Sequence, residues 1–173
     1  MKKLPAILVA ALACVLAYAV PLPQDSDEHF GRGMNAFGKG QYDVAIDHFS
    51  KALEQDAFNV GIRFNRATCY LRLRKYDEAI TDLSKCIELA PDVTQAYMQR
   101  AAAYAATRQR PLALQDVDTV IARDSVFPRA HVLRARLTMD MGLDTMAACR
   151  DFRTALRLGD STALKFMPTQ CRQ

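Results

Sequence analysis

The sequence predicts an all-α fold in which pairs of helices are stacked at a constant interval. The apolar positions of GQYDVAIDHFSKALEQDA, residues 40–57, return 34 residues later in RKYDEAITDLSKCIELAP, residues 74–91, so that Ala45 is matched by Ala79. The chain of 173 residues contains only 7 Gly and 7 Pro, which favours helices over a series of short strands and turns. A period of this length accommodates two helices of about 12 to 14 residues and two short connections.

Each period also repeats a first helix, which precedes the segments just quoted. Small residues recur at one position of this helix and at one position of the second helix. Because small side chains at a contact allow two helices to approach closely, these positions predict the packing within each pair. They are Gly33, Ala67, Ala101 and Ala135 in the first helices and Ala45, Ala79 and Ala113 in the second helices.

The pattern continues toward the end of the chain with one irregularity. A third copy includes residues 108–125, and a fourth copy fits only if one residue is inserted after Gly142. The last segment, residues 159–173, contains a short apolar helix that Pro168 ends. Because the end of a solenoid exposes an apolar face, we expect this segment to pack on the last repeat as a cap.

The paired helices resemble the tetratricopeptide repeat, whose signature is a small residue, an aromatic residue, Ala, a bulky apolar residue, Ala and Pro at fixed intervals. The resemblance is weaker in the third copy, where Arg110 replaces Tyr and Ser125 replaces Pro. The signature residues are Gly33, Tyr42, Ala45, Phe49 and Ala52 in the first copy and Ala67, Tyr70, Ala79, Leu83 and Pro91 in the second. The resemblance covers residues 26–158 and implies a right-handed solenoid of about four helix pairs with a C-terminal capping helix. The expected repeats are residues 26–59, 60–93, 94–127 and 128–158, with the cap at 159–173.

The N-terminal segment MKKLPAILVAALACVLAYAV predicts a secretory signal peptide at residues 1–19. Lys2 and Lys3 precede an apolar run, and Ala17-Tyr18-Ala19 supplies a small-x-small cleavage site. Residues 20–25 then form a linker, and we expect an exported protein, periplasmic or secreted, similar to small bacterial envelope proteins with such repeats. The alternative is an uncleaved membrane anchor at residues 4–20, because this apolar run is close to the shortest that spans a bilayer.

Charge is unevenly distributed along the chain. Residues 20–90 hold 9 basic and 11 acidic side chains, whereas residues 91–173 hold 12 and 8. Such a balanced total excludes the strongly basic footprint of a nucleic-acid-binding protein. We interpret the arginines of the second half as solvated helical faces, in preference to a site for an acidic partner.

No catalytic or metal-binding motif is present in the sequence. It lacks a glycine-rich phosphate loop, a nucleophile elbow and the paired-cysteine spacing of a zinc site, so we expect neither an enzyme nor a cofactor. The three histidines, His29, His48 and His131, are interpreted as structural.

The cysteines fall into two groups. Cys69 and Cys86 are expected to be buried and too far apart to bond. Cys149 and Cys171 are a possible disulfide if the cap packs on the last repeat helix, and the sequence leaves open whether they are bonded.

The resemblance implies that the first helix of each repeat lines a concave groove. Its side chains here are unusually apolar, which predicts a surface that binds a partner polypeptide. The alternative is that neighbouring helices or the linker cover part of this surface. The predicted groove residues are Phe30, Met34, Phe37, Phe64, Asn65, Leu71, Gln95, Met98, Gln99, Val132, Arg136 and Met139.

Chaperone-binding members of the family hold a terminal carboxylate with Lys, Asn, Asn, Lys and Arg on these first helices. The corresponding places are Phe30, Met34, Asn65, Gln95 and Gln99, so only Asn65 matches. The missing cations and the secretory signal both disfavour a cytosolic chaperone adaptor. We therefore expect a non-enzymatic scaffold for another protein or peptide, and the alternative is a homo-oligomer that associates through the same apolar surface.

Overall fold

The computed structural model describes residues 24–171. The expected signal peptide lies outside the described residues, as does most of the expected linker. The first helix begins at Gln24, so residues 24 and 25 belong to this helix and not to a linker.

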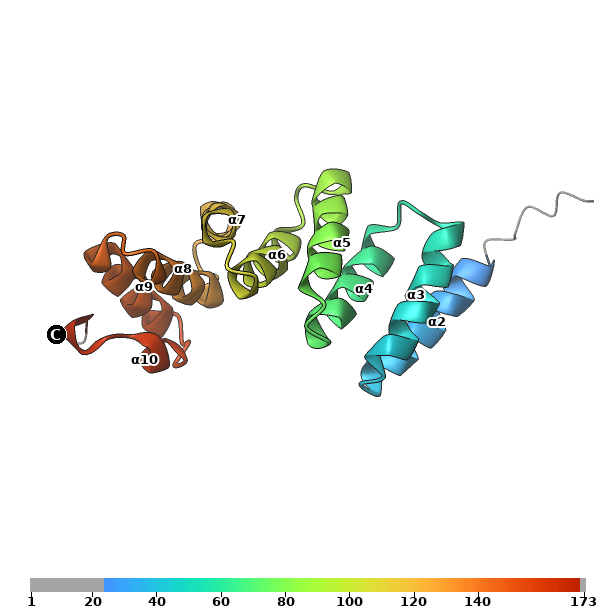
Figure 1. Cartoon of the computed structure of the whole chain (residues 1–173), viewed down its shortest axis with the longest axis horizontal. Coiled ribbons are helices and arrows are strands. Elements are labelled where there is room, and N and C mark those ends of the chain that lie inside the picture. The colour runs from blue at the N-terminus through green and yellow to red at the C-terminus, as the bar shows by residue number, and fades with distance from the viewer. Residues whose placement is uncertain (1–23, 172–173) are drawn as a thin grey trace, which may run out of the picture.

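The described residues form four pairs of α-helices, followed by one short helix and a 3-10 turn, and they contain no strand. The pairs are arranged in chain order along an elongated molecule, with α2 and α3 at one end and α9 and α10 at the other (Figure 1). The predicted all-α fold is therefore confirmed. The helices are α2 (Gln24–Gly38), α3 (Tyr42–Gln55), α4 (Val60–Arg72), α5 (Tyr76–Leu89), α6 (Thr94–Ala106), α7 (Arg110–Arg123), α8 (Pro128–Asp140), α9 (Thr145–Arg157) and α10 (Ala163–Phe166), and the turn is Thr169–Cys171.

The turn inside each pair reverses the chain through one residue with positive φ. This residue is glycine in the first and fourth pairs, Gly40 (φ 72°) and Gly142 (φ 65°), but arginine in the others, Arg74 (φ 59°) and Arg108 (φ 62°). The backbone N–H that follows closes the turn onto the preceding helix, as when Lys75 donates to the carbonyl of Tyr70 at 2.9 Å.

The fourth turn is one residue longer than the others. Leu143 stands between Gly142 and the residue that caps α9, Asp144, whose carboxylate accepts hydrogen bonds from the backbone N–H groups of Met146 and Ala147 at 2.8 and 3.1 Å. The one-residue insertion after Gly142 is thereby confirmed.

The core runs along the solenoid as successive clusters between helices. At the small-residue position of the first helices, Ala67, Ala101 and Ala135 are fully buried. Gly33 takes this place in the first pair because Phe49 packs against it, and a Cβ on Gly33 would lie only 2.6 Å from the Phe49 ring. The size of these residues thus sets how closely the two helices of a pair approach.

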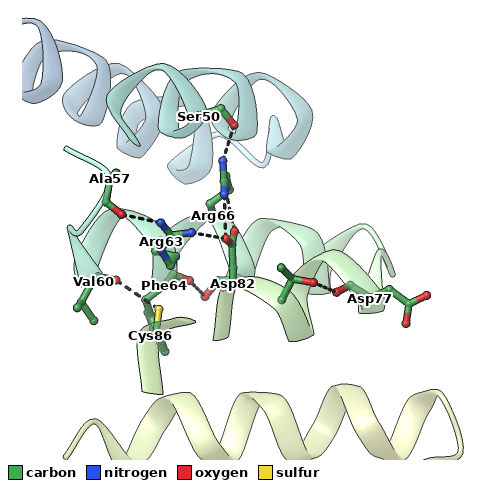
Figure 2. Close-up of polar contacts among 11 residues, drawn as sticks. Ser50, Ala57, Val60, Arg63, Phe64, Arg66, Asp77, Asp82 and Cys86 are labelled. Carbon is green, nitrogen blue, oxygen red and sulfur yellow. Dashed lines mark hydrogen bonds and ion pairs between the residues drawn. The ribbon is translucent and has the colours of Figure 1, made fainter. Parts of the chain in front are cut away.

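Three partly buried arginines join the second, third and fourth repeats to the repeat that precedes each of them. We call these residues the arginine ladder: Arg66, Arg100 and Arg134. Arg66 donates from Nε and Nη2 to the two carboxylate oxygens of Asp82, both at 2.8 Å, and from Nη1 to the Ser50 hydroxyl at 2.9 Å (Figure 2). Each guanidinium therefore connects its own first helix to the second helix of its repeat and to the second helix of the preceding repeat.

The same arrangement recurs with the repeat period. Arg100 binds both oxygens of Asp116 at 2.8 Å and the Ser84 hydroxyl at 3.0 Å. Arg134 binds Asp151 at 2.7 Å through two nitrogens and Asp118 at 3.1 Å. The interpretation of the second-half arginines as solvated helical faces is wrong for Arg100 and Arg134, because each pairs with a buried carboxylate, that of Asp116 or Asp151.

Candidate peptide-binding groove

The first helices of the repeats lie on the inner side of the solenoid. Helix α4 contacts α6, and α6 contacts α8, whereas the second helices are separated from one another by these first helices. The exposed side chains of α4, α6 and α8 therefore lie on one side of the solenoid, the side on which the groove was predicted.

The predicted groove residues differ widely in exposure. Met34, Gln95 and Arg136 are exposed. Val132 is buried, and the remaining eight are half-buried: Phe30, Phe37, Phe64, Asn65, Leu71, Met98, Gln99 and Met139.

Much of the apolar surface in this set is used within the solenoid itself. The ring of Phe30 lies 6.0 Å from that of Phe49, and the ring of Phe37 meets Tyr42 edge-on at 5.7 Å. Phe64 packs against the cluster that contains Leu83. The concave wall is consequently less apolar than the sequence predicted, because aromatic groups that the pattern placed on the surface fill the spaces between helices.

The prediction for Val132 is wrong. Its side chain is only 7% exposed and packs in one cluster with Ala163 and Met167 of the C-terminal segment. In the same region the guanidinium of Arg136 lies 4.2 Å from the centre of the Phe166 ring. The cap thus occupies the place that the first helix of a fifth repeat would take, and it covers the last part of the groove.

A pocket opens between α6 and α8, next to this covered part. Its floor consists of alanines and leucines, its rim carries two arginines and one carboxylate, and its volume is about 250 Å³. Such a pocket can hold one apolar side chain of a bound segment. The two arginines and the carboxylate at the rim can pair with charged groups that flank that side chain. The lining residues are Ala102, Ala105, Ala106, Arg110, Leu133, Arg136, Leu137 and Asp140.

Amide and hydroxyl groups line the groove further toward α4. The Thr68 hydroxyl lies 3.2 Å from Oε1 of Gln99, which links the inner faces of α4 and α6. The Asn65 side chain donates to the carbonyl of Gly61 at 2.9 Å within its own helix. Gln95 is exposed. These groups can exchange hydrogen bonds with the backbone of a bound segment.

Cys149 and Cys171 form a disulfide, with Cα atoms 5.0 Å apart. This bond fastens the C-terminal segment to α9, next to the cluster that buries Val132. Cys69 and Cys86 are buried free thiols, and burial raises the pKa of each to about 11, so that both stay protonated at neutral pH.

The histidines contact side chains within the solenoid. His131 lies between the Asp151 carboxylate, at 3.0 Å, and the Ser125 carbonyl, at 2.9 Å, and the Nδ1 atoms of His29 and His48 lie 3.2 Å apart. Within residues 24–171, no group of three or more His, Cys, Asp and Glu is placed to hold a metal ion. None of the helices in that range has the length and apolar character needed to cross a membrane.

Comparison with known proteins agrees with the repeat geometry. Residues 30–94 match the family model described as Tetratricopeptide repeat. This match covers most of the first two helix pairs, and the other two pairs have the same arrangement.

The similar proteins include one curated relative and two solved structures. RNA polymerase II-associated protein 3 of Xenopus tropicalis is 34% identical over 93 residues, which cover 54% of this chain but only 14% of that protein. The structure described as the first TPR of Spaghetti (RPAP3) bound to HSP90 peptide SRMEEVD is 28% identical, with a TM-score of 0.66 over 69% of this chain and 94% of that one. A structure of MamA, 20% identical, shares the fold with a TM-score of 0.78 over 83% of this chain and 79% of that one.

Proposed function

We propose that this protein is a non-enzymatic scaffold that binds a segment of a partner polypeptide in its concave groove. The observation that carries the proposal is the pocket between α6 and α8, which has an alanine floor and a charged rim on the inner side of the solenoid. The similar structure with a bound peptide supports the same class of ligand.

The groove favours a particular chemistry in the bound segment. An apolar side chain fills the pocket above Ala102 and Ala106, and an acidic neighbour pairs with Arg136 at the rim. The amides of Asn65, Gln95 and Gln99 contact the backbone of the segment beside this anchor. Because four of the five clamp positions lack the cation or amide of the chaperone-binding members, recognition here does not depend on a terminal carboxylate.

Ala102 is the best position for a test, because it is exposed on the groove floor and its substitution leaves the core intact. Phe64 is less suitable, since it packs against buried residues and its loss would weaken the fold. Peptides selected from a displayed library should bind the purified protein in fluorescence anisotropy. The substitution Ala102→Trp should abolish this binding, whereas Gln115→Trp, at an exposed position of α7, should leave it unchanged. Equal binding by both variants would show that the groove is not the site.

We also propose that the protein is exported. The signal-like segment at residues 1–19 and the Cys149–Cys171 disulfide support an oxidising compartment. A fusion of alkaline phosphatase to the C-terminus should be active in the producing cell, and mass spectrometry without reduction should find the bonded pair. An inactive fusion and two free thiols would contradict export.

A further inference from the structure

The two ends of the solenoid carry opposite net charge. Residues 24–59, which form the first repeat, hold 7 acidic and 3 basic side chains. Residues 128–171, which form the last repeat and its cap, hold 4 acidic and 7 basic side chains. These segments lie at opposite ends of the elongated molecule (Figure 1).

The acidic end presents a hollow between α2 and α3 with a volume of about 520 Å³. Asp27 and Glu28 stand at this hollow together with Val44, whose side chain is 48% exposed, and with Arg32, which pairs with Glu28. On the adjacent turn of α3, a hydrogen bond from Lys51 lowers the pKa of Asp47, so that this carboxylate is also charged at neutral pH. The end therefore combines exposed carboxylates with an apolar contact.

The basic end presents a stripe along the exposed side of α9, formed by Met146, Arg150, Arg153 and Arg157. Met146 is 61% exposed, and the Arg150 side chain is 65% exposed with its nearest carboxylate, that of Asp144, at 3.7 Å. The buried carboxylate of this helix, Asp151, lies away from the stripe and is held by Arg134. The stripe also borders a shallow hollow of about 580 Å³ that includes Leu156.

The arginine ladder excludes one way in which two copies could meet. Arg153 stands at the place where Ser50, Ser84 and Asp118 accept the ladder arginine of the next repeat, and Arg32 stands at the ladder position of the first repeat. A second copy stacked as a continuation of the solenoid would bring these two arginines together. Two copies must therefore meet in another way than by continuing the stack of repeats, and the exposed side of α9 is available for such a contact.

We propose that the protein associates with itself head to tail, the acidic α2–α3 end of one copy binding the basic α9 stripe of the next. This contact is independent of the groove and leaves it open to a peptide. Because the two surfaces differ, it is a heterologous contact that extends into chains unless the geometry closes a ring.

The test uses sedimentation velocity on the purified protein at about 0.05 M salt, where interactions between exposed charges are least screened. The wild-type protein should form oligomers whose fraction rises with protein concentration and falls when salt is raised to about 0.5 M. Two double variants remove one end each: Arg150→Glu with Arg157→Glu, and Asp27→Lys with Glu28→Lys. Each should sediment as a monomer.

Mixing the two variants provides the decisive measurement. The first variant keeps the native acidic end and the second keeps the native basic end, so an equimolar mixture should form oligomers that neither forms alone. A matched control for the first variant, Arg74→Glu with Arg108→Glu, makes the same change in net charge at exposed turns of the middle repeats and should associate like the wild type. A monomeric wild-type protein, oligomers in either end variant alone, or no recovery on mixing would each overturn the proposal.

Discussion

The arginine ladder leads to a sharp prediction for stability, which Arg100→Met tests. Arg100 donates two hydrogen bonds of 2.8 Å to Asp116 and one of 3.0 Å to Ser84. The Asp116 side chain is 6% exposed, so removal of the guanidinium would leave a carboxylate inside the protein without its partner. Methionine keeps most of the apolar stem of arginine and therefore isolates the loss of the charged group.

The expected cost follows from the burial of that carboxylate. Removal of one partner from a buried ion pair costs about 3 kcal/mol or more, whereas the loss of an exposed pair costs at most about 1 kcal/mol. For a chain of this size a loss of about 3 kcal/mol lowers the melting temperature by roughly 6 to 12 °C. Urea unfolding followed by circular dichroism at 222 nm measures the difference directly.

Two further variants separate the ion pair from a general effect of losing an arginine. Arg72→Met removes an exposed arginine from the end of α4 and should change the stability by less than about 0.5 kcal/mol. The double variant Arg100→Met with Asp116→Leu removes both charges and should recover most of the loss, because the unpaired carboxylate is gone. If Arg100→Met costs no more than Arg72→Met, the ladder does not hold the repeats together and our account of their packing is refuted.

Three other substitutions test local features of the fold. Gly33→Ala should destabilise by about 1 to 3 kcal/mol, because its Cβ would press against the Phe49 ring, and thermal melts will show this. Replacement of Cys149 and Cys171 by serine should cost about 3 kcal/mol, the value for a loop of this length, and reduction of the wild-type protein should lower its melting temperature equally. Arg74→Gly should stabilise by about 0.5 to 1 kcal/mol, since glycine adopts positive φ without the clash of a Cβ, and an unchanged urea midpoint would contradict this.

The repeat architecture was predictable from the sequence because small and apolar residues recur at fixed spacing. Each helix pair must bury the same stripe against the next, so Ala67, Ala101 and Ala135 mark the same contact in three repeats. The insertion after Gly142 was also visible, because the apolar pattern of α9 is displaced by one residue. Periodicity of this kind is preserved wherever packing demands it.

The sequence analysis did not predict the arginine ladder, although its arginines and aspartates recur at the repeat spacing. Arg66, Arg100 and Arg134 are separated by the repeat period, and so are Asp82 and Asp116. Arginine and aspartate are usually exposed, which made a solvated face the natural interpretation. A charged residue that recurs in register with the core is better interpreted as part of the contact between repeats.

The exposure of the groove could not be predicted by the same argument. The spacing fixes which face of a first helix points inward, but it does not determine how much of a side chain the next helix covers. Phe64 and Val132 occupy the same position in their repeats, and both lie on the inner side. Phe64 is half-buried against its own repeat, while Val132 is buried because the cap reaches across it.

The cap therefore determines where the groove ends. It packs on α8 and α9, its disulfide joins it to α9, and Phe166 stands over Arg136 at the edge of the pocket. The covered end, and Arg153 at the place where the other second helices carry an acceptor for the ladder arginine, both oppose the addition of a fifth repeat. What remains open on the inner side is the stretch from Met34 to the pocket above Ala102, and a bound segment must contact its amides and small side chains. If the proposed function holds, the specificity of the groove depends on the few polar groups that border this stretch, and less on the apolar area that the sequence predicted there.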